Sequence, residues 1–399
     1  MRLPTRSAAA LAHAQLGDAR ARLARRDAEL LRLQVAVSEI AAPTGDEGRR
    51  AAWVAARFAG YRLADVRIDG AGNVIGRRHG AEDAAPVAVC AHLDTVFPLD
   101  TALRVREERG RLVGPGIGDN GRGLAAMLAL AEEIDGHRLR TRRPVDFVAT
   151  VGEEGLGDLR GIKHVFAAGA RWPAAVVALD GAGDERVVNR ALASRRFRVH
   201  FRGPGGHSWA AFGAPNAVHG AARAAAKLAG VALPREPRTT LTVGRIGGGL
   251  SVNSIPDEGW LEVDLRSTSP AHIERYDREL RAAVRAALAE ENDRRAPGSP
   301  ALAATVTVIG DRPGGELPPA DPLVSIALDA TRLIGRTPEL ATASTDANVP
   351  INLGVPAITI GAGGRGGDAH TAGEWFENVD GTLGVARALT IVVAAAGLA

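Results

Sequence analysis

The sequence has 399 residues, 46% of them hydrophobic and 24% charged, which is typical of a globular protein with about two domains. The net charge is only +3, and the arginines are spread along the chain without interleaved aromatics, which argues against a nucleic-acid-binding protein. No apolar run reaches the roughly 18 residues that a membrane-spanning helix needs. We therefore expect neither nucleic acid nor a membrane as a partner.

The N-terminus and the single cysteine indicate the compartment. The apolar stretch after Met1 is short and contains His13, so it is a poor signal peptide. The Arg/Glu/Leu pattern that follows, through Leu33, is typical of an amphipathic helix. Cys90 is the only cysteine, so a disulfide framework is impossible and a reducing compartment is natural. We expect a cytoplasmic protein.

From about Val35 onward, helices and strands alternate. Continuous apolar runs such as 87–91 are typical of strands buried on both faces of a sheet. Alternating elements of this kind predict an α/β domain with helices on both faces. The expected helices are 49–58 and 123–134, and the expected strands are 66–69, 74–77, 87–91, 145–151 and 175–179.

The pattern changes near Ala193. Segments 196–201 and 260–265 alternate polar and apolar residues with period two, as in a sheet with one wet face. Two helices, 217–228 and 270–291, accompany them, which predicts a small α+β sandwich. Buried-strand character resumes after Pro313, at 357–360. We therefore expect a domain of residues 192–311 inserted into a larger domain made of 1–191 and 312–399.

The first candidate site follows the strand at 87–91. Residues two apart in an extended segment face the same way, so His92 and Asp94 can act together. His92 would be a metal ligand, and the Asp94 carboxylate would hold its other ring nitrogen. The alternative for His92 is a core histidine whose hydrogen bonds are satisfied.

The second segment, Gly114–Gly121, is rich in glycine and ends in Asp119 just before a predicted helix. Asp119 stands where a helix N-cap belongs, which is its structural alternative. Capping alone, however, does not require so many glycines. Asp119 is therefore a second candidate ligand.

The third segment contains two adjacent carboxylates, Glu153 and Glu154, at the end of the strand 145–151. Their mutual repulsion would be offset by a nearby cation. One could bind a metal while the other faces a reacting water. A solvated acidic turn is the alternative.

Asp180 follows the strand 175–179, and His370 lies in a late glycine-rich loop. Each is weak evidence alone. Together the five segments place two histidines and several carboxylates at the carboxyl ends of predicted strands, where open α/β sheets bind ligands. Nitrogen and oxygen donors of this kind suit zinc or manganese.

These segments resemble the di-zinc metallopeptidase family that includes peptidase T, carboxypeptidase G, succinyl-diaminopimelate desuccinylase and the aminoacylases. The resemblance runs in order from about Ile40 to Glu374. It is carried by His-x-Asp at His92, Gly-x-Gly-x-x-Asp ending at Asp119, Glu-Glu at Glu153, Asp-Gly at Asp180, Gly-Gly-His ending at His207, and the late His370.

The resemblance implies a zinc-exopeptidase-like catalytic domain, a mixed sheet with helices on both faces, that binds two Zn²⁺ per chain, with Mn²⁺ or Co²⁺ as possible substitutes. It assigns one ion to His92 and Asp180 and the other to Glu154 and His370, bridged by Asp119. It further implies that Asp94 supports His92 and that Glu153 is the general base for the attacking water.

The inserted α+β sandwich is then expected to be a lid or dimerisation domain, which favours a homodimer. His207 resembles the family's lid histidine, which stabilises the oxyanion and is commonly supplied across a dimer interface. Asn253 and Arg266 resemble contacts to the substrate carboxylate, a role that suits the bidentate arginine fork.

One departure from the family pattern leaves the substrate open. Asn120-Gly121-Arg122-Gly123 follows Asp119, where many relatives have Asp-Lys-Gly or a similar run. The leading interpretation is a di- or tripeptide exopeptidase. The alternatives are an amidohydrolase of N-acyl or N-carbamoyl amino acids and a non-catalytic metal- or peptide-binding relative, which would not need the general base Glu153.

Overall fold

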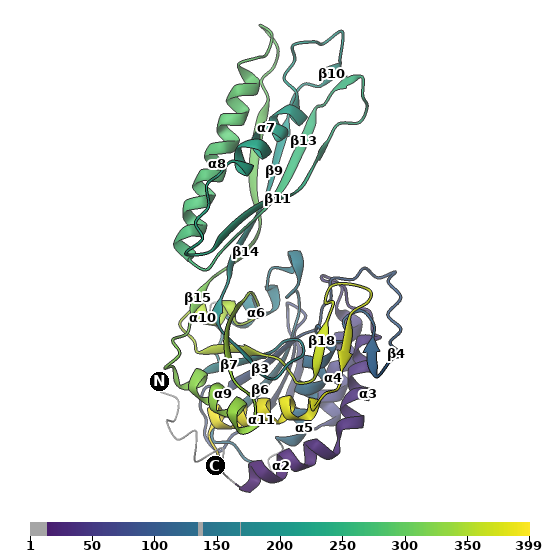
Figure 1. Ribbon diagram of the computed structural model, residues 1–399, viewed down its shortest axis with the longest axis vertical. Coiled ribbons are helices and arrows are strands. Elements are labelled where there is room, and N and C mark those ends of the chain that lie inside the picture. The colour runs from purple at the N-terminus through teal and green to yellow at the C-terminus, as the bar shows by residue number, and fades with distance from the viewer. Residues whose placement is uncertain (1–13, 135–138, 168) are drawn as a thin grey trace. The chain divides into compact units, whose positions relative to one another are not determined.

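A computed structural model describes residues 14–134, 139–167 and 169–399, so the expectations for residues 1–13 lie outside the described part. The chain forms two compact units (Figure 1). Unit 1 comprises residues 1–191 and 316–399, and unit 2 comprises 192–315. Unit 2 is thus one continuous segment inserted into unit 1.

A mixed sheet forms the centre of unit 1 and has nine strands within the described residues. Its order is β1-β2-β6-β3-β7-β17-β8, and β15 and β16 also belong to it. The four strands β6, β3, β7 and β17 are neighbours and run parallel. The strands are β1 (Ala64–Ile68), β2 (Val74–Arg78), β3 (Val87–His92), β6 (Val145–Thr150), β7 (Ala175–Leu179), β8 (Arg186–Ala191), β15 (Gly315–Glu316), β16 (Glu339–Ala343) and β17 (Ala357–Ile360).

Helices cover both faces of this sheet, because alternate residues of each central strand enter different cores. Val87 and Val89 pack into the larger core, whereas Ala88 and Cys90 pack into the smaller one. The larger core is covered by α2 (Ala14–Arg25), α3 (Asp27–Ser38), α4 (Gly48–Gly60), α5 (Gly121–Glu133), α9 (Pro322–Leu333) and α11 (Gly381–Ala396). The smaller core is covered by α6 (Arg160–Val165) and α10 (Asn348–Asn352). Burial on both faces explains why these strands are apolar throughout.

Unit 2 is an antiparallel sheet of order β11-β13-β9-β14 with two helices packed against it. Along β13, Leu261, Val263 and Leu265 enter the core while the residues between them are only partly covered, which accounts for the period-two pattern. The elements are β9 (Ala193–Arg202), β10 (Gly206–His207), α7 (Ala217–Ala229), β11 (Thr239–Gly248), β12 (Ser254–Ile255), β13 (Glu258–Ser267), α8 (Pro270–Asn292) and β14 (Ala303–Arg312).

The predicted fold class is confirmed: a mixed α/β sheet with helices on both faces, and additional antiparallel sheets. A small sheet of order β18-β19-β5-β4 lies in unit 1, formed by β4 (Arg106–Glu108), β5 (Arg111–Val113), β18 (Arg365–Gly367) and β19 (Trp375–Glu377). Within the described ranges, no helix is both long enough and apolar enough to cross a membrane.

Candidate metal centre

Four neighbouring parallel strands deliver the candidate ligands to one edge of the sheet. His92 is the last residue of β3, and Glu153 and Glu154 follow β6. Asp180 follows β7, and β17 leads toward the loop that carries His370. Because parallel strands end at the same edge of a sheet, residues far apart in sequence meet there.

Asp119 lies at the centre of this group. Its Oδ1 is 2.9 Å from His92 Nε2, and its Oδ2 is 3.2 Å from His370 Nε2. His370 Nε2 also lies 2.9 Å from Glu154 Oε1, and His92 Nε2 lies 3.7 Å from Asp180 Oδ1. Two ligand triads therefore share Asp119: His92 with Asp180, and Glu154 with His370. In each triad the ligand atoms lie within 4.8 Å of one another.

Asp119 is not the N-cap of α5, which was the structural alternative for it, because the next residue is the cap. The Asn120 side-chain oxygen accepts the N–H of Gly123 at 3.1 Å in the first turn of α5. The same oxygen accepts the N–H of Gly181 at 3.2 Å, and Asn120 Nδ2 donates to the carbonyl of Leu179 at 2.9 Å. Asn120 thus holds the backbone on both sides of Asp180, and it leaves Asp119 free to face the histidines.

The support of His92 differs from the prediction. His92 Nδ1 lies 3.0 Å from the backbone carbonyl of Asp94, whereas the nearest Asp94 carboxylate oxygen is 3.7 Å away. The carbonyl therefore orients the ring and directs Nε2 toward Asp119. The Asp94 carboxylate makes its hydrogen bonds to Thr44 and to the backbone of Glu153 and Glu154.

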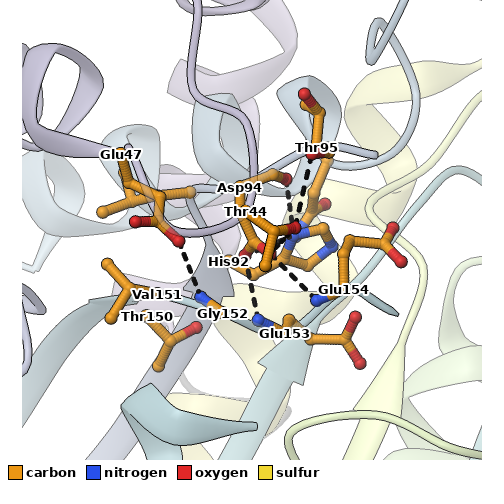
Figure 2. A network of polar contacts seen from close by, with 12 residues as sticks. Thr44, Glu47, His92, Asp94, Thr95, Thr150, Val151, Gly152, Glu153 and Glu154 are labelled. Atoms are coloured by element: carbon orange, nitrogen blue, oxygen red, sulfur yellow. Dashed lines mark hydrogen bonds and ion pairs between the residues drawn. The ribbon is translucent and has the colours of Figure 1, made fainter. Parts of the chain in front are cut away.

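That carboxylate organises the turn that carries the two glutamates (Figure 2). Asp94 Oδ1 accepts the N–H of Glu153, and Oδ2 accepts the N–H of Glu154, each at 2.9 Å. The hydroxyl of Thr44 donates to Oδ2 at 2.8 Å. Glu47 Oε1 accepts the N–H of Gly152 at 3.1 Å, just before the pair. Glu47 and Thr44 are positioning groups that no motif in the sequence had indicated.

Burial and neighbouring charges shift the pKa values of several groups in this site. Burial alone would raise the pKa of Asp94, but His92 and the N–H of Glu154 lower it to about 2. Burial and the charge of Asp119 raise the pKa of Glu154. The hydrogen bond to Asp119 raises the pKa of His370 to about 9. Three carboxylates and two imidazoles are therefore held together in a way that suits divalent cations, whose charge offsets the carboxylate repulsion.

The predicted residues of unit 2 fall into two places. His207 in β10 pairs with Ser254 in β12, and the carbonyl of Asn253 accepts the N–H of Ser208 at 3.0 Å. His207 and Asn253 are thus neighbours, and both are exposed. Arg266 lies near the other end of β13, about 26 Å along the strand from Glu258 at roughly 3.3 Å per residue. Arg266 Nε also donates to Asp264 at 2.6 Å.

A pocket of about 900 Å³ in unit 1 opens beside the candidate ligands. Asp119 and Asp180 form part of its wall. Among the described residues, the exposed charged side chains of its wall that form no ion pair are Glu185, Arg186, Glu339 and Arg365. The pocket is therefore charged with both signs close to the ligand cluster.

A family model described as peptidase family M20/M25/M40 matches residues 88–394. The chain belongs to this family. The matched span includes all five candidate ligands, and the resemblance inferred from the motifs is confirmed. Members are peptidases or related amidohydrolases, so the chain is a hydrolytic enzyme of this kind.

Solved structures share the fold over nearly the whole chain. Aminopeptidase PepT from Bacillus cereus is 23% identical, with a TM-score of 0.71 over 93% of this chain and 98% of that one. A tripeptidase from Staphylococcus aureus is 22% identical, with a TM-score of 0.74 and the same coverage. An amidase of the hydantoinase/carbamoylase family from Burkholderia vietnamiensis is 18% identical, with a TM-score of 0.69 over 94% and 97%. At these identities the likeness establishes the fold.

Proposed function

We propose that this member of the M20/M25/M40 family is a di-metal exopeptidase for di- or tripeptides. The observation that carries the proposal is the position of Asp119, whose two oxygens face two different histidines. We assign one ion to His92 and Asp180, the other to Glu154 and His370, and the bridge to Asp119. Zn²⁺ is the ion that we expect, with Mn²⁺ or Co²⁺ as substitutes, because the donors are imidazole and carboxylate.

Two bound divalent ions would supply Lewis acidity that polarises the scissile carbonyl and activates water. Glu153 is the base in this proposal. It is only 5% exposed, and its ligand atom lies within 4.8 Å of those of His92 and Glu154. Its backbone is fixed by Asp94, so the carboxylate can take a proton from the attacking water and return it to the leaving amine.

The charged pocket supports a small zwitterionic substrate. An unblocked di- or tripeptide carries an ammonium and a carboxylate, and the pocket offers Glu185 and Glu339 for the first and Arg365 for the second. A charge-assisted hydrogen bond to each end would orient the peptide.

The second candidate is an amidohydrolase of N-acyl or N-carbamoyl amino acids. The fold shared with a hydantoinase/carbamoylase family amidase supports it. The two substrates differ at one end, because an acylated amine carries no positive charge. A panel of dipeptides, tripeptides, N-acyl and N-carbamoyl amino acids, assayed with added Zn²⁺, Mn²⁺ or Co²⁺, separates the candidates. Turnover confined to acylated amino acids would refute the exopeptidase assignment.

We further propose a homodimer formed through unit 2, in which His207 stabilises the oxyanion and Asn253 and Arg266 bind the substrate. A tripeptide spans only about 10 Å when extended. Glu258 and Arg266, near the two ends of β13, are farther apart than such a substrate is long. In the proposed dimer, Asn253 and Arg266 would contact one substrate from different subunits. We also propose a cytoplasmic location, which the lone buried Cys90 supports.

A further inference from the structure

Glu374 fills a ring of backbone N–H groups beneath the proposed bridging ligand. Its Oε1 accepts the N–H of Gly118 at 2.8 Å and of Asp119 at 2.7 Å. Its Oε2 accepts the N–H of Gly116 at 2.8 Å. The side chain is 2% exposed, so these three bonds are made away from water. Converging backbone N–H groups of this kind form a nest for an anion, and here the anion is a side chain of the protein itself.

The loop is shaped to admit this carboxylate. Gly116 has a φ of +71°, a conformation that side chains other than glycine rarely adopt. A Cβ on Gly118 would lie 3.1 Å from Glu374 Oε1, closer than ordinary contact. These two glycines let the N–H groups of Gly116, Gly118 and Asp119 point inward. They account for a glycine content that capping of α5 does not require.

Glu374 is also fixed to the loop that carries His370. Its backbone N–H donates to the carbonyl of Thr371 at 3.1 Å, which closes the turn after His370. Its own carbonyl accepts the N–H of Gly114 at 2.9 Å. One residue thus joins the Asp119 loop to the His370 loop, although those two ligands are 251 positions apart in sequence.

We propose that Glu374 is a positioning residue that holds Asp119 and His370 at the spacing at which they share one metal ion. The inference rests on the proposed di-metal function. The ion assigned to Asp119, Glu154 and His370 depends on both joined loops. The other ion shares only Asp119 with these loops, and it takes His92 and Asp180 from strand ends to which Glu374 makes no hydrogen bond in the described part of the chain. Replacement of Glu374 should therefore weaken the binding of the ion at Glu154 and His370 more than the binding of the ion at His92 and Asp180.

The test is a zinc titration of metal-free protein against a chromophoric chelator. The variant Glu374→Gln keeps the size of the side chain but turns one acceptor oxygen into an NH₂ group that faces N–H donors. Glu377→Gln is the matched control, because Glu377 lies in the same hairpin and, among the described residues, its carboxylate forms an ion pair with Arg111 alone, at 3.7 Å. Wild type and Glu377→Gln should each bind two ions. Glu374→Gln should bind the ion at Glu154 and His370 about 10- to 100-fold more weakly, as when a supporting partner of a ligand is removed, and the ion at His92 and Asp180 with a smaller loss.

A second measurement does not depend on metal. Hydrogen exchange of the peptide covering 114–121 should be at least about 10-fold faster in metal-free Glu374→Gln than in wild type, because its N–H groups lose an acceptor. Unchanged exchange, or two ions bound with wild-type affinity, would overturn the role of Glu374. A wild-type protein that binds no metal would instead refute the proposed function, so the two failures are distinguishable.

Discussion

The carboxylate of Asp94 accepts the backbone N–H of Glu153 at 2.9 Å, so a residue expected to support a histidine also positions the proposed base. Asp94→Asn replaces one acceptor with an NH₂ group facing the N–H of Glu153 or of Glu154. We expect kcat to fall about 10- to 100-fold while metal content stays near two ions, because the base loses its position.

Asp69→Asn is the control for that variant. Asp69 also accepts three backbone N–H groups, from Ala71, Gly72 and Asn73, but in a turn outside the ligand cluster. The kcat of the Asp69→Asn variant should match that of wild type. An Asp94 variant with normal kcat would contradict the role of this carboxylate in orienting the base.

The Glu153→Gln substitution separates catalysis from metal binding. It removes the proton acceptor but keeps the shape, so kcat should fall by about 100-fold or more with both ions retained. His370→Ala should instead lose one ion. Metal analysis and steady-state kinetics on the two variants check this pair of outcomes. Substantial turnover by Glu153→Gln would require a different base.

The fold was predictable because its cores impose simple periodicities. The strand at Val87–His92 is buried on both faces and therefore apolar throughout, and the strand at Glu258–Ser267 alternates because only one face is buried. The five candidate ligands were predictable because they follow such strands or lie in glycine-rich loops. Those signals are local, and each can be read within about ten residues of the sequence.

The supporting residues were not predictable from such signals. Glu374 acts on a loop 255 positions away, and Glu47 acts on one 105 positions away, so nothing near either residue reveals its partner. The contacts of Asp94 were predictable only in part, for a related reason. A His-x-Asp spacing indicates that two residues are close, but it does not say whether the carbonyl or the carboxylate meets the ring.

A buried acid behind the site should make the metal-free protein less stable as pH rises. Asp346 is 3% exposed, its Oδ2 accepts the hydroxyl of Thr150 at 2.5 Å, and its Oδ1 has no hydrogen-bond partner among the described residues. Burial raises its pKa from 3.8 to about 6. Between these values the folded protein holds a proton that the unfolded chain releases, so stability falls as pH rises through this window.

Asp346→Asn should remove that penalty. The metal-free variant should be more stable than wild type at pH 8, by at most about 3 kcal/mol, and equal to it below about pH 4. Thermal unfolding at the two pH values measures the difference. Asp146→Asn should do the opposite at pH 8, because Asp146 pairs with Arg77 at 2.6 Å. An Asp346 variant no more stable than wild type at pH 8 would refute this account.

The proposed dimer predicts that two inactive variants complement each other. Glu153→Ala lacks the base and His207→Ala lacks the oxyanion contact. In a hybrid dimer, the Glu153→Ala subunit would supply His207 to the intact base of its partner. Mixing and re-equilibrating equal amounts should restore about a quarter of wild-type activity, since half of the dimers are hybrids with one complete site. A fully active monomer at high dilution would exclude the cross-subunit arrangement.

A crystal structure of the zinc-reconstituted protein would show whether Asp119 bridges two metal ions. Anomalous scattering at the zinc edge should locate two ions roughly 3.5 Å apart, the separation typical of two-metal hydrolases. One oxygen of Asp119 should bind the ion next to His92, and the other should bind the ion next to His370. A single ion, or two ions that Asp119 does not touch, would contradict the account.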